Sequence, residues 1–403
     1  MKIIELLMYL YLLLKPYYLF ESGGIQISDC FLILAFLMFI LFTKEKKNYT
    51  KEIFNENKMF LLFVILTMIV NVFYFLFYLK FKFILSSLYF IFNYLTIIIF
   101  AFLFKHNNNF SIKVSKIFKF NLIVQLILTL FSIGRTYGTI RWMSTFNDPN
   151  QFAFYAFLSY SYIYAMSYRN HDSKYIFIYF LISLYLIVES CSTGMLLGMI
   201  TYLAMLLFNF VKKFPVYFAK YKNKIALISI VVFTFFISSS LLGNSSRFNF
   251  SKYIYNSDIY GRVINKISRV DKNEMNDSST MTIWQERGYD KIALYPHYLI
   301  YGSGEGEYNR FSKSAHTSHG LGEIHATLPS IWFYYGLIPF IIILLWIAGK
   351  FSKTNKDLIL IVYVPLIFES FFLLNSRQAL FWILIAIGPY LKKDDNYEVK
   401  ESK

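Results

Sequence analysis

The segment MFLLFVILTMIVNVFYFLFYL, which spans Met59–Leu79, decides the fold class of this chain. It contains no charged side chain, and its few polar residues stand among leucine, isoleucine, valine and phenylalanine. A helix of about 20 such residues crosses the roughly 30 Å hydrocarbon layer of a bilayer. The segment therefore predicts a transmembrane helix.

Similar apolar runs recur along the whole chain. Hydrophobic residues make up 57% of its 403 residues and charged residues only 16%. We therefore predict an all-α polytopic membrane protein of about twelve transmembrane helices, organised as a single transmembrane domain over residues 1–403. Lys15-Pro16 interrupts the first run, but no small-residue cleavage site follows it, so we expect an uncleaved helix rather than a signal peptide. The clearest runs are Met59–Leu79, Phe83–Phe104, Ile225–Leu242 and Leu328–Ala348; the others are Ile3–Phe20, Ile25–Thr43, Phe120–Gly134, Gln151–Tyr168, Tyr175–Val188, Met195–Val211, Leu358–Leu374 and Ala379–Leu391.

Basic residues predict the orientation of these helices. If both termini are cytoplasmic, every cytoplasmic loop carries at least two Lys or Arg, whereas the opposing short loops at 21–29 and 189–194 carry none. That asymmetry is the positive-inside pattern. The extended hydrophilic segment 244–325 is then one large loop on the outer side. The cytoplasmic segments would be 44–58, 105–119, 169–174, 212–224, 350–357 and the tail from Lys392.

The net charge of +16 is mainly a consequence of this topology. Because the basic residues are spread over separate loops, they do not form the single stripe that nucleic acid requires, and we expect no nucleic-acid partner. Cys30 and Cys191 are too few for a disulfide framework or a metal site.

Arginine and lysine are distributed differently across the predicted membrane. The chain has 31 Lys and nine Arg. In this topology Arg169 is cytoplasmic and the other eight arginines are outside. Arginine binds phosphate oxygens in pairs through its planar fork, whereas lysine is a hydrated point charge. The set predicts an anionic ligand at the outer membrane surface, although any one of these arginines could simply contact lipid headgroups. The eight are Arg135, Arg141, Arg247, Arg262, Arg269, Arg287, Arg310 and Arg377.

Two short motifs lie at predicted outer positions. In Arg141-Trp-Met-Ser-Thr-Phe-Asn-Asp-Pro-Asn150, Asp148 and Pro149 are typical of an N-cap and the first helical position. Capping leaves Arg141 and Asn150 unexplained, and a helix N-terminus beside an arginine is suited to an anion. Gly302-Ser-Gly-Glu-Gly306 lacks the Gly-Lys-Ser/Thr ending of a phosphate loop, so we expect a turn.

The outer loop contains four of the six histidines, His297, His316, His319 and His325. Their spacing matches no zinc motif closely, and no Cys stands nearby, so we predict no metal. His325 lies where the polar loop meets a helix, in Glu323-Ile-His-Ala-Thr-Leu. With an ordinary pKa near 6.5, a histidine there is suited to act as a general base, and Glu323 to act as an alternative base or to fix the histidine tautomer.

These motifs together resemble the superfamily of O-antigen ligases and Wzy-type polysaccharide polymerases. The resemblance rests on the 141–150 motif before a middle helix, a large late outer loop with a Gly-x-Gly, and His325, Leu328 and Gly336 at the start of the next helix. The family pattern places its functional arginines at Arg141 and Arg287 and its histidine at His325. Two positions depart from it: Ala326 stands where many members have Asn, and Ser192-Thr193-Gly194 where many have Ser-Arg.

The resemblance implies a GT-C-like, lipid-sugar glycosyltransferase fold in a bacterial inner (cytoplasmic) membrane, with its active site on the outer face. The donor would be an oligosaccharide on undecaprenyl pyrophosphate and the acceptor a second lipid-linked repeat. A chain-length regulator protein is a further implied partner, and no cofactor or metal is implied. His325 and Glu323 would be catalytic. The substrate-binding residues would be Arg141, Arg287, Arg135, Asn150 and Arg377.

Three functions remain open at this point. We favour a polymerase of O-antigen or capsule for two reasons. The departures from the family pattern suggest a divergent branch. The outer loop also mixes charge with aromatic residues that are suited to contact sugar faces, namely Tyr289, Tyr295, Tyr298, Tyr301 and Tyr308, although any one of them could simply lie at the membrane interface. An O-antigen ligase, which transfers glycan to a lipid A core, shares the same catalytic residues. A flippase or other transporter is the alternative from another class. It is less favoured because transporters place ionisable residues at mid-membrane, whereas Glu189 and Glu369 lie near predicted helix ends.

Overall fold

Helices account for 77% of the residues described in the structure, which is a computed structural model. The described residues are 2–19, 26–43, 47–137, 141–170, 174–211, 282–318 and 322–391. The first group of helices consists of α1 (Lys2–Leu14), α2 (Ile27–Thr43), α3 (Lys47–Glu56), α4 (Lys58–Tyr78), α5 (Lys82–His106), α6 (Asn108–Leu130), α7 (Pro149–Asn170), α8 (Ile176–Glu189) and a helix over Thr193–Val211.

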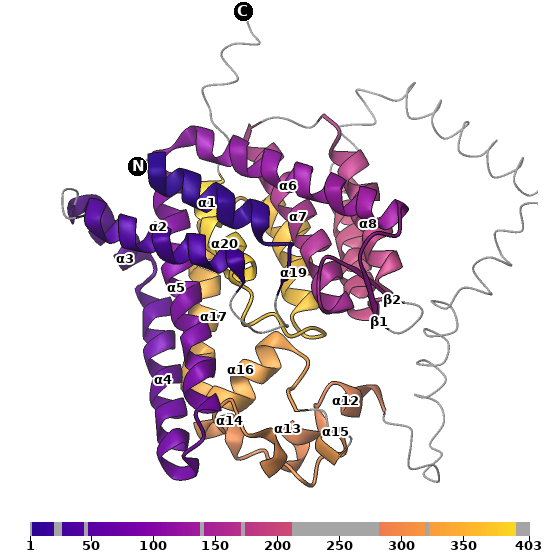
Figure 1. The fold of residues 1–403 in the computed structure, drawn as a ribbon. Coiled ribbons are helices and arrows are strands. Elements are labelled where there is room, and N and C mark those ends of the chain that lie inside the picture. The colour runs from indigo at the N-terminus through magenta and orange to yellow at the C-terminus, as the bar shows by residue number, and fades with distance from the viewer. Residues whose placement is uncertain are drawn as a thin grey trace, which may run out of the picture.

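The second group begins with short helices on the segment that precedes α16 and ends with helices that return to the main bundle (Figure 1). Within the bundle α20 packs against α5, and α17 packs against α4. The elements are α12 (Ile283–Glu286), α13 (Asp290–Leu294), α14 (Tyr298–Tyr301), η1 (Tyr308–Arg310), α15 (Ala315–Ser318), α16 (Thr327–Tyr335), α17 (Leu337–Phe351), α18 (Lys356–Leu358), the π-helical η2 (Ile359–Tyr363), α19 (Val364–Glu369), α20 (Ala379–Ile387) and η3 (Gly388–Tyr390).

Three helices among the described residues are long and apolar enough to cross a membrane, namely Lys58–Tyr78, Lys82–His106 and Thr193–Val211. They are compatible with the predicted helical membrane protein, but three do not establish about twelve spans. The predicted run Ile225–Leu242 lies outside the described residues. Shorter apolar helices occupy Ile27–Leu41, Ile176–Glu189, Leu337–Phe351 and Ala379–Tyr390.

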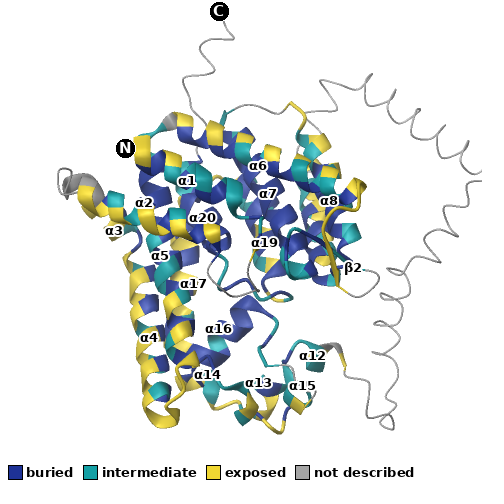
Figure 2. Ribbon diagram, in the orientation of Figure 1, coloured by how far each residue is buried: buried dark blue, intermediate teal, exposed yellow. Residues whose placement is uncertain are grey.

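Helix α4 has an apolar outer face and polar groups inside, the reverse of a helix on a water-soluble protein. Thr67 and Asn71 are fully buried, whereas Ile69 and Leu76 are 58% and 66% exposed. The exposed residues form the stripe along α4 in Figure 2. An extended apolar surface of this kind favours contact with lipid.

Connections that the topology prediction places on the cytoplasmic side lie close together. Lys105 at the end of α5 pairs with Glu52 and Glu56 of α3 at 2.6 and 3.3 Å. The Tyr390 hydroxyl also donates to Glu56. The outer connections meet elsewhere, since the Tyr74 hydroxyl at the far end of α4 donates to the carbonyl of Gly302 at 2.8 Å.

The predicted span Leu328–Ala348 is two helices rather than one. Gly336 separates α16 from α17 with a φ of +84°. A Cβ at Gly336 would lie 2.6 Å from the carbonyl oxygen of Ile300 and 2.7 Å from the nitrogen of Gly302. The helix ends here because the positive φ of Gly336 is not helical. Only glycine fits at this position, because the backbone of 300–302 leaves no room for a Cβ.

The 130–148 connection contains a small antiparallel hairpin, which is a departure from an all-α fold. Strands β1 (Arg135–Tyr137) and β2 (Arg141–Ser144) pair with Arg135 opposite Ser144. The hairpin leads directly to Asp148, whose Oδ1 accepts from the N–H groups of Asn150 and Gln151 at 2.7 and 3.0 Å. The predicted N-cap is therefore confirmed, and it occupies the N–H groups that the sequence suggested for an anion.

Candidate functional site

Residues from four separate connections line one cavity of about 710 Å³. They come from the α1–α2 connection, the start of α7, the segment before α16 and the segment between α19 and α20, and helices α2 and α5 supply the rest of the lining. The lining is Lys15, Tyr18, Gln26, Asp29, Ile33, Leu85, Leu88, Tyr89, Phe92, Asp148, Asn150, Gln151, Glu323, His325, Leu373, Leu374, Asn375, Arg377 and Gln378.

Four of the seven residues selected from the sequence lie in this lining, namely His325, Glu323, Asn150 and Arg377. Each stands at a helix end or in a connection, where the chain leaves the apolar bundle. Helix ends expose polar backbone and tolerate charge, so the cavity collects polar groups at one end of an otherwise apolar structure.

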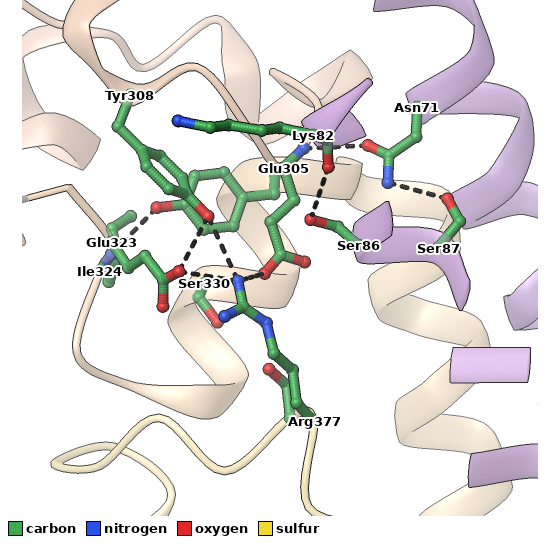
Figure 3. A network of polar contacts seen from close by, with 12 residues as sticks. Asn71, Lys82, Ser86, Ser87, Glu305, Tyr308, Glu323, Ile324, Ser330 and Arg377 are labelled. Atoms are coloured by element: carbon green, nitrogen blue, oxygen red, sulfur yellow. Dashed lines mark hydrogen bonds and ion pairs between the residues drawn. The ribbon is translucent and has the colours of Figure 1, made fainter. Parts of the chain in front are cut away.

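Arg377 is the centre of the polar network in Figure 3. Its Nη2 donates to Glu305 Oε1 at 2.6 Å and to Glu323 Oε1 at 2.8 Å. The same nitrogen lies 3.3 Å from the hydroxyl of Tyr308, and the guanidinium carbon lies 5.3 Å from the ring centre of Tyr89. Burial opposes the charge of Arg377, but the neighbouring carboxylates outweigh it and raise the pKa of Arg377 well above its ordinary value.

Tyr308 contacts both Glu323 and Arg377 in this network. Its hydroxyl donates to Glu323 Oε1 at 3.3 Å. Burial and the charges of Glu305 and Glu323 raise the pKa of Tyr308 well above its ordinary value, so the hydroxyl keeps its proton. The network therefore has two negative groups, one positive group and a neutral phenol.

Arg141 lies behind Asn150 rather than among the lining residues. Its Nη2 donates to Asn150 Oδ1 at 2.9 Å, and its Nε donates to the carbonyl of Ser190 at 3.2 Å. The Ser192 hydroxyl donates to the same Asn150 oxygen at 2.9 Å. These bonds fix the orientation of the Asn150 amide at the cavity wall.

Arg287 supports the backbone on either side of the site. Its Nη1 donates to the carbonyl of Phe372, and its own carbonyl accepts from the N–H of His325 at 3.0 Å. Burial lowers the pKa of Arg287 from its ordinary value. Arg287 thus ties the segment that carries His325 to the segment that leads to Arg377. Arg135 is exposed on β1 and donates to Asn147, away from the lining residues.

A second ion pair lines the cavity and was not selected from the sequence. Lys15 Nζ lies 3.0 Å from Asp29 Oδ1, with side chains 11% and 13% exposed. Asp29 Oδ2 also accepts from the N–H of Gln26 at 2.9 Å. Lys15 interrupts an apolar run, which is the sequence signal that could have identified it.

Glu305 was also missed from the sequence, whereas Tyr308 was selected there only as one of several outer-loop aromatic residues. Glu305 lies inside the predicted turn, and Gly302, Gly304 and Gly306 all have positive φ, so the turn is confirmed. The amides of Ser303 and Gly304 donate to the carbonyls of Phe333 and Tyr334 at 3.1 and 2.7 Å. These N–H groups are used by the protein itself. A polar residue between glycines was the available signal for Glu305.

Of the outer-loop histidines, His319 and the side chain of His316 lie outside the described residues. Within the described residues no three His, Cys, Asp or Glu side chains are grouped to hold a metal ion. No protein-family model matches the chain, and no curated protein matches it either.

Proposed function

We propose that this protein is a membrane glycosyltransferase that polymerises lipid-linked oligosaccharide repeat units of O-antigen or capsule. One observation carries the proposal: apolar and charged side chains line the same cavity. Ile33, Leu85, Leu88 and Phe92 suit a polyprenyl chain, whereas His325, Arg377 and Asn150 suit a diphosphate and sugar hydroxyls. A lipid-linked sugar has both parts.

The proposed reaction joins two such substrates at the outer face of the bacterial inner membrane. The acceptor hydroxyl oxygen attacks the anomeric carbon of the donor from the face opposite the leaving group. The new C–O bond forms as the bond from that carbon to the diphosphate oxygen breaks. His325 accepts the hydroxyl proton, and undecaprenyl pyrophosphate leaves with the electron pair.

Arginine stabilises the charge that develops on the leaving diphosphate, so the proposed reaction requires no metal. Arg377 lines the cavity and is the first candidate for this contact. Arg141 and Arg287 hold Asn150 and the His325 backbone, which supports a positioning role for both. Their direct contact with the diphosphate stays a prediction.

The arrangement of the connections supports the proposed topology of about twelve spans with both termini cytoplasmic. The cavity is lined from the predicted outer connections, and Lys105, Glu52 and Glu56 meet among the predicted cytoplasmic ones. In this proposal residues 244–325 form a large outer loop. A chain-length regulator protein would act on the same outer side.

The proposal is tested by replacing the proposed base. Purified full-length protein with undecaprenyl-pyrophosphate repeat units should yield a ladder of longer lipid-linked chains, with or without EDTA. His325→Ala should reduce the rate by at least about 100-fold, the lower range for loss of a general base. His297→Ala is the matched control, because His297 is exposed and absent from the cavity lining. A near-normal ladder from His325→Ala would refute the assignment.

Two other functions have different expected outcomes. An O-antigen ligase would not elongate the repeats until a lipid A core is added. A transporter would move the lipid across vesicles without changing glycan length. Transport is less favoured because Glu189 and Glu369 end helices α8 and α19 rather than lying in their middles.

A further inference from the structure

The two carboxylates bound to Arg377 are not equivalent. Both accept from its Nη2 at similar distances, 2.6 Å for Glu305 and 2.8 Å for Glu323. Their exposure differs, since the Glu305 side chain is 4% exposed and the Glu323 side chain 28%. The difference matters because a buried carboxylate without its cation is costly, whereas a partly exposed one can exchange its partner for water.

Glu305 is held at both carboxylate oxygens and at its backbone N–H. Its Oε2 accepts from the hydroxyl of Tyr335, and its backbone N–H donates to Asn71 Oδ1 at 2.9 Å. Asn71 in turn donates to the Ser87 hydroxyl at 2.9 Å. Helices α4, α5 and α16 are thereby joined at this carboxylate, as Figure 3 shows for the Asn71 side.

The turn that carries Glu305 is packed too tightly to shift. A Cβ at Gly304 would lie 2.7 Å from the Tyr74 ring, and one at Gly302 would lie 2.6 Å from the carbonyl carbon of Tyr335. Arg310 Nη2 donates to the carbonyl of Gly304, and its guanidinium lies 5.0 Å from the centre of the Tyr74 ring. Glu305 is therefore a fixed counter-charge.

Glu323 is the more exposed of the two carboxylates. It lies in the irregular segment that precedes α16, and its carboxylate is at the cavity surface. Its contact with the Tyr308 hydroxyl is long, at 3.3 Å. A rotation about its side-chain bonds would release Arg377 without moving a helix.

Arg377 also has unused hydrogen-bonding capacity. Its three bonds all leave from Nη2, although a guanidinium has five N–H donors. The Nε is buried and has no acceptor among the described residues. An anion with more oxygen atoms than a carboxylate, bound in place of Glu323, would supply the guanidinium with a further acceptor.

We infer that Arg377 exchanges one carboxylate for the ligand: Glu323 occupies the place of a phosphate until the diphosphate displaces it, while Glu305 stays bound and positions the guanidinium. The identity of the ligand as a lipid diphosphate rests on the proposed function. The exchange itself rests on the unequal burial of the two carboxylates. Once it leaves Arg377, the Glu323 carboxylate would face His325 and the acceptor, since both residues line the same cavity.

The test compares two isosteric substitutions in binding of inorganic pyrophosphate to the detergent-solubilised full chain, measured by calorimetry. Glu323→Gln removes the competitor and should tighten the Kd roughly fivefold, the effect of losing one partly exposed ion pair. Glu305→Gln leaves Glu323 as the sole counter-charge of Arg377 and should weaken binding roughly threefold or more. Arg377→Lys should abolish both differences.

Opposite signs for the two substitutions support the exchange. If both substitutions tighten binding, only net charge matters and the exchange is overturned. An unchanged Kd in Glu323→Gln, or no pyrophosphate binding by the wild type, would also overturn the exchange. If Glu305→Gln does not fold, the Glu323→Gln result decides alone. The elongation assay on the wild-type preparation separates the two proposals. If the wild type does not elongate the repeats but the two substitutions still shift the Kd in opposite directions, the proposed function is contradicted and the exchange stands.

Discussion

Removing the positive charge of Arg377 should destabilise the protein mainly through Glu305. In Arg377→Met the Glu305 carboxylate, 4% exposed, stays buried without its cation. Breaking a buried pair from one side costs about 3–5 kcal/mol, whereas neutralising both partners costs much less. We therefore expect Arg377→Met to lose about 3–5 kcal/mol of unfolding free energy, and the double variant with Glu305→Gln to recover at least about 2 kcal/mol of it.

The control is the corresponding double-mutant cycle of Arg377→Met with Glu323→Gln. Glu323 accepts from the same nitrogen but is 28% exposed, so water can solvate its carboxylate when Arg377 is gone. Its coupling to Arg377 should stay below about 1 kcal/mol. The two cycles differ in burial rather than in bond length.

Unfolding of the full chain in mild detergent can be followed by tryptophan fluorescence during titration with a denaturing detergent. Trp382 is well placed as a reporter, because its Nε1 donates to the carbonyl of Ser376 at 2.7 Å, next to Arg377. Equal coupling of Arg377 to both carboxylates, or no recovery in the Glu305 double variant, would refute the argument.

Three further outcomes follow from single contacts. Gly302→Ala should lower the unfolding free energy by at least about 2 kcal/mol, because φ is +82° and the added Cβ would meet the Tyr335 backbone. Gly349→Ala is the control and should be neutral or stabilising, because nothing lies within 4 Å of its Cβ position. Equal melting temperatures of the two variants in detergent would contradict this prediction. Asp148→Ala should lower the unfolding free energy by about 1 kcal/mol, measured in the same way, because two N–H groups of α7 lose their acceptor. Asp148→Asn should keep most of that stability, because asparagine is also a good N-cap residue. Burial lowers the pKa of Lys291 to about 8, so its charged form is disfavoured in the folded state. As the pH increases from 8 towards the ordinary lysine pKa, the melting temperature of the wild type should therefore rise relative to that of Lys291→Met. Parallel pH profiles of the two proteins would contradict this prediction.

Local rules allowed part of the fold to be predicted from the sequence. The apolar runs at Met59–Leu79 and Phe83–Phe104 correspond to α4 and α5, because their length and composition alone determine that they form long helices. The Asp148 cap is local in the same way. The break at Gly336 was not predictable, because it depends on a backbone approach from residues 300–302.

The site was predictable where charge interrupts an apolar pattern. His325, Glu323 and Arg377 stand where apolar runs end, and all three line the cavity. The pairing of Arg377 with a carboxylate was not predictable, because Arg377 and Glu305 are 72 residues apart and meet only once α16 packs against α4 and α20 against α5. Nothing in the sequence distinguishes the roles of the three arginines. Arg377 lines the cavity, whereas Arg141 and Arg287 bind amide and backbone groups outside the lining.

The charges around the cavity imply that an anionic ligand binds by exchange rather than by simple addition. Lys15 is paired with Asp29, and Arg377 with Glu305 and Glu323. Both cations in the lining are therefore already matched by carboxylates. A diphosphate gains the charge of Arg377 only to the extent that a carboxylate withdraws, so part of the attraction is offset by the lost ion pair. Such a site favours release of the product diphosphate, since Glu323 is at hand to reclaim the arginine. A polymerase that must discharge a lipid diphosphate after every addition benefits from that arrangement.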